Sequence, residues 1–209
     1  MNEFKDKLVL ITGAGRGSGR LLAEAFGERG AFVAANDISP VNVDEVVAGI
    51  VSRGGSAKSY LDDVAKKIAV QTMVKQIEDD LGHIDILVNH AAVKPRVPLL
   101  DMDEWDWHRV LDVNLTGAFL MMQSVGHAMR VQSRGVIINL ITGAGEGSDK
   151  EAGAYQASMA GLLALTRSAA RELSPHGIRV NGLVDVHQDK IVDVVLDLCL
   201  SNANGKIVE

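Results

Sequence analysis

The chain has 209 residues, of which 47% are hydrophobic and 23% charged, and its net charge is -6. This composition fits one globular domain over residues 1–209. The absence of a basic block argues against nucleic acid and anionic membranes as partners. No apolar run is long enough to cross a bilayer and no signal-like segment follows Met1, so we expect a cytoplasmic protein. The single cysteine, Cys199, excludes an internal disulfide and is expected to be a buried structural thiol.

The first predicted elements are an apolar strand from Leu8 and a helical segment from Arg20 to Glu28, joined by a glycine-rich turn. Strand, glycine turn and helix in that order present backbone N–H groups to a phosphate. The candidate ligand-binding residues of this turn are Gly13, Gly15, Arg16, Gly17, Ser18 and Gly19. Small residues here permit the tight turn and the close approach of a pyrophosphate. A glycine-rich loop without a ligand is the alternative, which the flanking strand and helix disfavour.

A second strand, Ala31 to Asn36, ends at Asp37. An acid roughly 20 residues beyond a glycine turn can accept hydrogen bonds from the adenosine ribose of a dinucleotide. Its charge repels a 2′-phosphate and therefore favours NAD over NADP. Arg16 has the opposite effect, because a guanidinium can bind that phosphate. We give Asp37 more weight and predict NAD as the cofactor, with NADP as the alternative.

Strand and helix patterns continue to alternate along the rest of the chain. The further predicted strands are 56–61, 84–88, 135–140, 178–182 and 206–208. The further predicted helices are one through 43–50, then 65–81, 103–131 with a bend near Gly117, 152–173 and 189–201. This alternation predicts an α/β fold with a Rossmann-like, doubly wound parallel sheet of about six or seven strands and helices on both faces. A ligand would bind at the carboxyl ends of the strands, where the strand order reverses.

Short motifs then follow one another in a characteristic order. They are Thr12-Gly13 with Gly17 and Gly19, Asp63-Val64, Asp85 to Asn89 with Ala91, Asp112-Val113-Asn114, Ile137-Ile138-Asn139, Tyr155, and Arg179-Val180-Asn181. In these motifs the chain resembles the short-chain dehydrogenase/reductases, from about Lys7 onward. The resemblance implies hydride transfer between a nicotinamide cofactor and a small carbonyl or alcohol. It also implies that Asp63, Val64, Asn89 and Ala91 belong to the cofactor site.

The resemblance also implies a set of catalytic residues. Tyr155 stands at the position of the family's acid/base tyrosine. Thr142 stands at the position of the serine that orients the substrate oxygen, and it keeps a hydroxyl. Asn114 matches the asparagine that holds a proton-relay water. The family's lysine, four residues after the tyrosine, is replaced by Met159, which shares a helix face with Tyr155 and has no charge.

This replacement predicts atypical or impaired catalysis. A free tyrosine titrates near pKa 10, and moving that to neutral pH takes about 4 kcal/mol, which a thioether does not supply. Lys94 and Arg96 are the nearest candidates for a substitute charge, but we expect them to be solvated loop residues. We likewise interpret His90 as structural, because a lone histidine beside a buried strand is more often hydrogen-bonded in place than catalytic.

Two functions remain open from the sequence. Residues 181–189 lead almost directly into the final helix, so most of the family's substrate-covering segment is missing. The first hypothesis is an NAD(P)-dependent oxidoreductase of the short-chain family. The alternative is a catalytically inactive nucleotide-binding protein that acts as a sensor, scaffold or oligomer partner. The helices 103–131 and 152–173 are those with which the family forms homodimers and homotetramers.

Overall fold

A computed structural model describes residues 2–142, 151–184 and 186–209. The described residues form a seven-stranded parallel sheet with the strand order β3-β2-β1-β4-β5-β6-β7. The strands are β1 (Leu8–Thr12), β2 (Phe32–Asp37), β3 (Ser56–Leu61), β4 (Ile86–Asn89), β5 (Gly135–Ile141), β6 (Ile178–Val184) and β7 (Ile207–Val208). The predicted doubly wound sheet is therefore confirmed.

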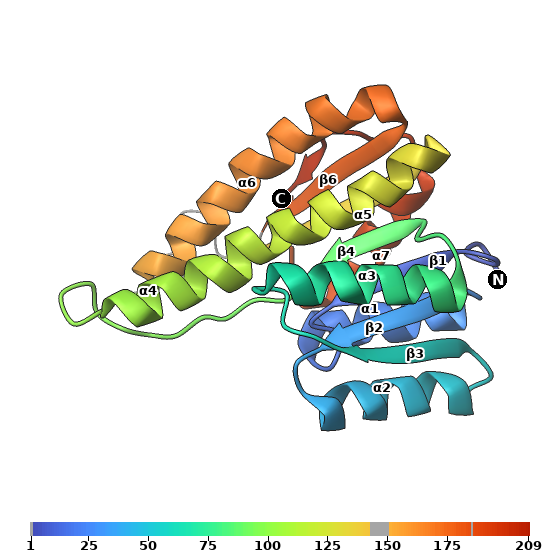
Figure 1. Cartoon of the computed structure of the whole chain (residues 1–209), viewed down its shortest axis with the longest axis horizontal. Helices are drawn as coiled ribbons and strands as arrows, with labels where there is room; N and C mark the ends of the chain where they lie inside the picture. Colours follow the sequence, from blue (N-terminus) through green and yellow to red (C-terminus); the bar gives the residue numbers. More distant parts are fainter. Residues whose placement is uncertain (1, 143–150, 185) are drawn as a thin grey trace.

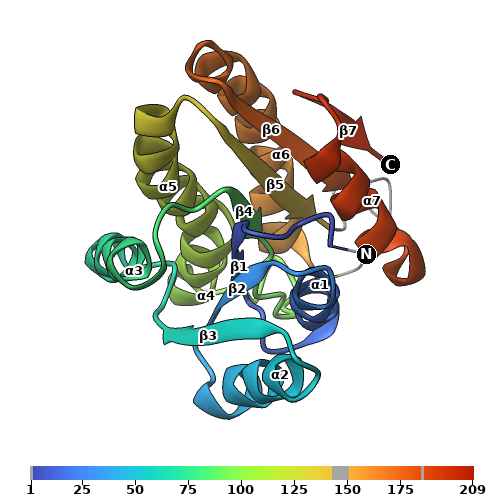
Figure 2. The same cartoon turned by 90° about the vertical axis from the view of Figure 1, so that its right-hand side faces the viewer.

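Helices cover both faces of this sheet, as Figures 1 and 2 show. They are α1 (Gly17–Glu28), α2 (Pro40–Ser52), α3 (Lys67–Leu81), α4 (Glu104–Leu111), α5 (Ala118–Gln132), α6 (Gly153–Leu173) and α7 (Gln188–Leu200). Alternate side chains of β1 enter different cores: Val9 and Ile11 pack with α1, α2 and α7, whereas Leu8 and Leu10 pack with α3, α5 and α6. Because both faces of the sheet are covered, the central strands β1, β4 and β5 are buried along their whole length, whereas the edge strand β3 is largely not.

The strand order reverses at β1, which pairs with β2 on one side and with β4 on the other. The chain therefore leaves the ends of β1 and β4 in opposite directions, which opens a crevice above the sheet. This is the place where the sequence predicts ligand binding. The loops that follow β1, β2, β3 and β4 all contribute to it.

The long helix predicted over 103–131 is interrupted by a π-helical turn, Asp112–Gly117, between α4 and α5. The three segments form one continuous rod in Figure 1. A Cβ on Gly117 would lie 3.0 Å from Val64, and one on Gly161 of α6 would lie 2.9 Å from Leu115. These small residues therefore serve packing within the chain. Turns of this kind are frequent at functional sites, and this one contains Asn114.

The last helix, α7, is attached to the sheet by a buried cysteine and by an arginine of β6. Cys199 of α7 is buried, as predicted, and burial raises the pKa of its thiol to about 12. Arg179 of β6 donates to the carbonyl groups of Leu198, Cys199 and Ser201, which stabilises the C-terminal end of α7. Among the described helices, none combines the length and apolar character that crossing a membrane requires.

Candidate functional site

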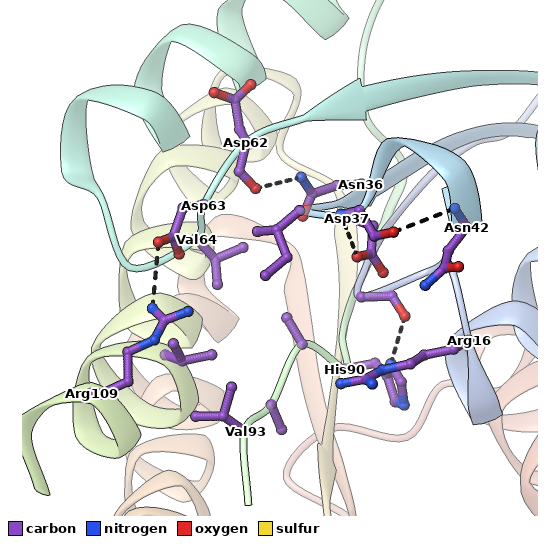
Figure 3. A pocket seen from close by; sticks show the side chains of 16 residues that line it. Arg16, Asn36, Asp37, Asn42, Asp62, Asp63, Val64, His90, Val93 and Arg109 are labelled. Carbon is purple, nitrogen blue, oxygen red and sulfur yellow. Dashed lines mark hydrogen bonds and ion pairs between the residues drawn. The ribbon is translucent and has the colours of Figure 1, made fainter. Parts of the chain in front are cut away.

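Two adjoining cavities lie at the carboxyl ends of the strands. The first has a volume of about 200 Å³, and Figure 3 shows Asp37 and Arg16 on one side of it and Asp63 and Arg109 on the other. The second, of about 250 Å³, is lined by Arg16, Gly17, His90, Ala92, Leu140 and Thr142. Arg16, His90 and Ala92 line both. Together the cavities form an elongated site that extends from Asp37 to Thr142.

The glycine turn has the geometry of an anion site. Gly13 and Gly17 adopt left-handed backbone conformations, with φ of +65° and +56°. A Cβ on Gly19 would lie 2.2 Å from the Gly13 carbonyl oxygen, whereas a Cβ on Gly17 would meet no heavy atom within 4 Å. The first turn of α1 carries no acidic residue and no side-chain cap. Its N-terminus therefore offers a phosphate both open space and a favourable dipole.

The carboxylate of Asp37 is held at the end of β2 by two backbone groups. One oxygen accepts from the Gly15 N–H at 2.9 Å and the other from the Ser39 N–H at 3.0 Å. Each oxygen keeps a further lone pair, so the carboxylate can still accept hydrogen bonds from a ligand's hydroxyl groups. Arg16 lies on the same side of the cavity (Figure 3).

On the opposite side, Asp63 pairs with Arg109 at 3.4 Å and accepts from the Ala65 N–H at 3.0 Å. Val64 is buried beside it, and both Asp63 and Val64 line the cavity. Arg109 was not predicted. It lies in α4, and its contact with Asp63 follows from how α4 packs beside the end of β3, which no local motif reveals.

His90 connects β1 to the loop after β4. Its Nδ1 lies 3.0 Å from the Gly13 carbonyl oxygen, which can only accept, so Nδ1 is assigned the hydrogen. The backbone N–H groups of His90 and Ala91 both donate to the Thr12 hydroxyl. Burial lowers the pKa of His90, so its ring is neutral at neutral pH. These contacts support the structural interpretation, because the ring holds the glycine turn in place.

A pair of hydroxyl groups lies at the far end of the site. The Thr142 Oγ1 and Tyr155 Oη atoms are 2.5 Å apart, so one donates to the other. Thr142 lines the second cavity. Met159, one turn along α6 from Tyr155, is 1% exposed and belongs to the same apolar cluster as Tyr155 and Val184.

Asn114 and Asn89 are buried and line neither cavity. The Asn114 amide accepts from the Val93 N–H at 2.8 Å and donates to the Val93 carbonyl and the Ser158 hydroxyl, each at 3.0 Å. Asn89 donates to Asn139 at 2.9 Å, and its own Oδ1 has no partner among the described residues. The Asn114 side chain supports the loop after β4, and Ala91, together with His90, Ala92 and Val93 of that loop, lines the first cavity. In the glycine turn, Gly13, Arg16 and Gly17 line the cavities, whereas Gly15, Ser18 and Gly19 do not.

Comparison with known proteins identifies the family. The sequence profile of short chain dehydrogenases matches residues 7–185. The chain belongs to the short chain dehydrogenase family. It is 41% identical over 180 residues to an uncharacterized oxidoreductase of Thermotoga maritima, which covers 86% of this chain and 71% of the relative. It is 38% identical over 195 residues to galactitol 2-dehydrogenase of Agrobacterium fabrum, with 91% and 75% covered.

Solved structures of dehydrogenases have the same fold. An NAD+-bound xylitol dehydrogenase superposes with a TM-score of 0.92 at 27% identity, covering 99% of this chain and 98% of the other. A gluconate 5-dehydrogenase of Burkholderia cenocepacia in complex with NADP and tartrate gives 0.90 at 27% identity, covering 99% and 95%. Relatives thus include proteins bound to either nicotinamide dinucleotide, in agreement with the predicted class of cofactor.

Proposed function

We propose that residues 1–209 form a single nucleotide-binding domain that transfers hydride between a nicotinamide dinucleotide and a small carbonyl or alcohol. The observation that carries this proposal is the pairing of an oriented Asp37 carboxylate with an open phosphate position at Gly17 in one elongated site. The cofactor, when bound, supplies or accepts the hydride. The residues that would border it are Gly13, Arg16, Gly17, Asp37, Asp63, Val64 and Ala91, and Gly15, Ser18, Gly19 and Asn89 would position them from outside the two cavities.

Each part of the site has its own task in this proposal. The glycine turn and the α1 N-terminus would hold the pyrophosphate, Asp37 would accept hydrogen bonds from the adenosine ribose, and Asp63 with Val64 would border the adenine. We expect NAD to be preferred over NADP, because the Asp37 carboxylate would repel a 2′-phosphate on the adenosine ribose. Arg16 reduces this preference without reversing it.

Catalysis is assigned to the hydroxyl pair. Tyr155 donates its proton to the substrate's carbonyl oxygen, or takes it back from the alcohol, while Thr142 hydrogen-bonds to the same oxygen. Asn114 assists by fixing the loop and helix around them. Met159 occupies the position of the family's lysine, and only residues 185–187 separate β6 from α7, which leaves little chain to cover a substrate. We therefore propose an atypical or impaired catalyst.

The second candidate is a catalytically inactive nucleotide-binding protein. It is favoured by Met159, which is buried in an apolar cluster beside Tyr155 and brings no charge to that residue. In either case we propose a cytoplasmic homodimer or homotetramer that assembles through the two long helical segments, 103–131 and 152–173.

The first test is a titration with NADH and, separately, NADPH, followed by energy transfer from tryptophan to the reduced nicotinamide. We expect saturable binding of NADH and weaker binding of NADPH. Asp37→Asn should weaken NADH binding about tenfold, the equivalent of about 1.4 kcal/mol. It should also narrow the difference between the affinities for NADH and NADPH. Asp44→Asn, in an exposed position of α2, should change neither the NADH affinity nor its difference from the NADPH affinity. Failure of both nucleotides to bind would overturn the proposed function, and preference for NADPH would overturn the choice of NAD.

A further inference from the structure

Lys94 lies against the proposed acid/base residue. Its Nζ atom is 4.9 Å from the centre of the Tyr155 ring. The sequence led us to expect a solvated loop charge at this position. The side chain is indeed exposed, but its ammonium group is placed over an aromatic ring in the proposed active site. Lys94 is therefore more than a solvated surface charge.

The loop that carries Lys94 is fixed on both sides of it. The N–H and the carbonyl of Val93 both bond to the Asn114 side chain, at 2.8 and 3.0 Å. On the other side, the Val97 N–H donates to the Glu151 carbonyl at 2.9 Å. The position of Lys94 thus follows from backbone hydrogen bonds and does not depend on the side chain alone.

Asn114 also connects this loop to the helix that carries Tyr155. Its amide donates to the Ser158 hydroxyl at 3.0 Å, and that hydroxyl donates to the Tyr155 carbonyl oxygen at 2.6 Å. Ser158 and Asn114 are both buried. One buried asparagine therefore sets the distance between the backbone beside Lys94 and the backbone of Tyr155.

We infer that Lys94 supplies the positive charge that Tyr155 lacks because Met159 is apolar. This inference rests on the proposed function. When the Tyr155 O–H bond breaks and the O–H bond of the product alcohol forms, the negative charge that remains on the phenolate faces the Lys94 ammonium. In the reverse direction the phenolate takes the proton back from the alcohol.

Elementary electrostatics gives the direction of this effect. An ammonium over a neutral ring is attracted by the ring quadrupole, whereas over a phenolate it is attracted by a full charge. The second attraction is stronger, so the ammonium favours the phenolate. Because Lys94 is exposed, solvent and salt screen the attraction, and the effect should weaken as the ionic strength rises.

The test is an alkaline titration of the tyrosinate absorbance, carried out without any cofactor. The chain contains two tyrosines. Burial raises the pKa of Tyr60 far above its ordinary value, and the hydrogen bond from its hydroxyl to Asp80 acts in the same direction. Tyr155→Phe leaves Tyr60 as the one remaining tyrosine, so the part of the absorbance change that this variant loses belongs to Tyr155.

At a fixed pH below the midpoint of the tyrosinate titration, Lys94→Met should form about fivefold less tyrosinate than the unchanged protein. High salt should reduce this difference between the two proteins. Lys94→Arg keeps the charge and should restore the signal. Arg96→Met, which removes a neighbouring cation of the same loop, should leave it unchanged. If Lys94→Met ionises like the unchanged protein, or if Arg96→Met has the same effect, the inference is wrong.

A second variant tests the compensation directly. Introducing Met159→Lys into Lys94→Met should return the amount of tyrosinate at this pH to that of the unchanged protein. The reason is that a positive charge then reaches Tyr155 from its own helix. Turnover should fall in Lys94→Met and recover in the double variant. If the double variant restores neither, Lys94 does not replace the missing charge. These titrations need no nucleotide, so their failure is distinguishable from the absence of NADH binding, which would overturn the proposed function itself.

Discussion

At the scale of the residue, His90 makes stability depend on pH. Its pKa is lowered in the folded protein by burial, so the unfolded chain binds a proton that the folded chain does not. The contribution of His90 to the free energy of unfolding should therefore be fully present above the histidine pKa of the unfolded chain, about 6.5. It should be lost as the pH falls below that value, by up to about 1.4 kcal/mol per pH unit.

His90→Asn removes this titration and keeps a side-chain donor for the Gly13 carbonyl. Denaturant unfolding between about pH 7.5 and about pH 5 should show a flatter profile for this variant than for the unchanged protein. His187→Asn, an exposed position in the short link before α7, should keep the original slope. Parallel profiles for His90→Asn and the unchanged protein would contradict the assignment of His90 as a neutral, partly buried group.

At the scale of the element, the turn that begins α1 contains two glycines with different surroundings: Gly19 is closely packed, whereas Gly17 borders the open space proposed for the phosphate. Gly19→Ala places a Cβ 2.2 Å from the Gly13 carbonyl oxygen and should destabilise the fold by about 1–3 kcal/mol. Gly17→Ala meets no atom and should cost only about 1 kcal/mol for its left-handed backbone. Its methyl group would nevertheless enter the open space where we propose that the phosphate binds, so NADH affinity should fall at least about tenfold.

Gly54→Ala is a matched control, because Gly54 also has a positive φ with open space around it but lies after α2, outside the cavities. It should reproduce the loss of stability of Gly17→Ala and leave NADH affinity unchanged. Unfolding curves and the energy-transfer titration measure the two effects separately. Equal NADH affinities for Gly17→Ala and Gly54→Ala would show that no phosphate binds at the turn.

The elements themselves could be predicted from the sequence, because their patterns are local. Leu8 to Thr12 is apolar on both faces, and Gly54 ends α2 where a turn is needed. The π-helical turn at Asp112–Gly117 could not be predicted in this way. It contains Asn114, whose side chain forms hydrogen bonds with Val93 and Ser158, and these two residues lie far away in sequence. The contacts of Arg109 with Asp63 and of Lys94 with Tyr155 also join residues that are far apart in the sequence. They depend on how the elements pack in the fold, so no local motif predicts them.

At the scale of the whole molecule, α5 and α6 border a groove with an apolar floor and a polar rim. A cavity of about 290 Å³ between them is lined by Phe119, Met122, Leu165 and Leu173 together with polar side chains that include Gln123, Arg130 and Glu172, and Phe119 is 42% exposed. Buried apolar area drives association of subunits, and a groove on neighbouring helices suits a symmetric contact with the same helices of a second copy. This agrees with our proposal of a homodimer or homotetramer.

Light scattering should therefore give a mass of at least two chains of 22.3 kDa. Phe119→Glu places a charge in the groove and should shift the protein to the monomer, because burying an unpaired carboxylate is costly. Leu100→Glu, at a position that is 98% exposed outside α5 and α6, should leave the assembly intact. A monomeric unchanged protein would contradict the proposal. A dimer that tolerates Phe119→Glu would place the contact elsewhere, and the groove would then have no part in assembly.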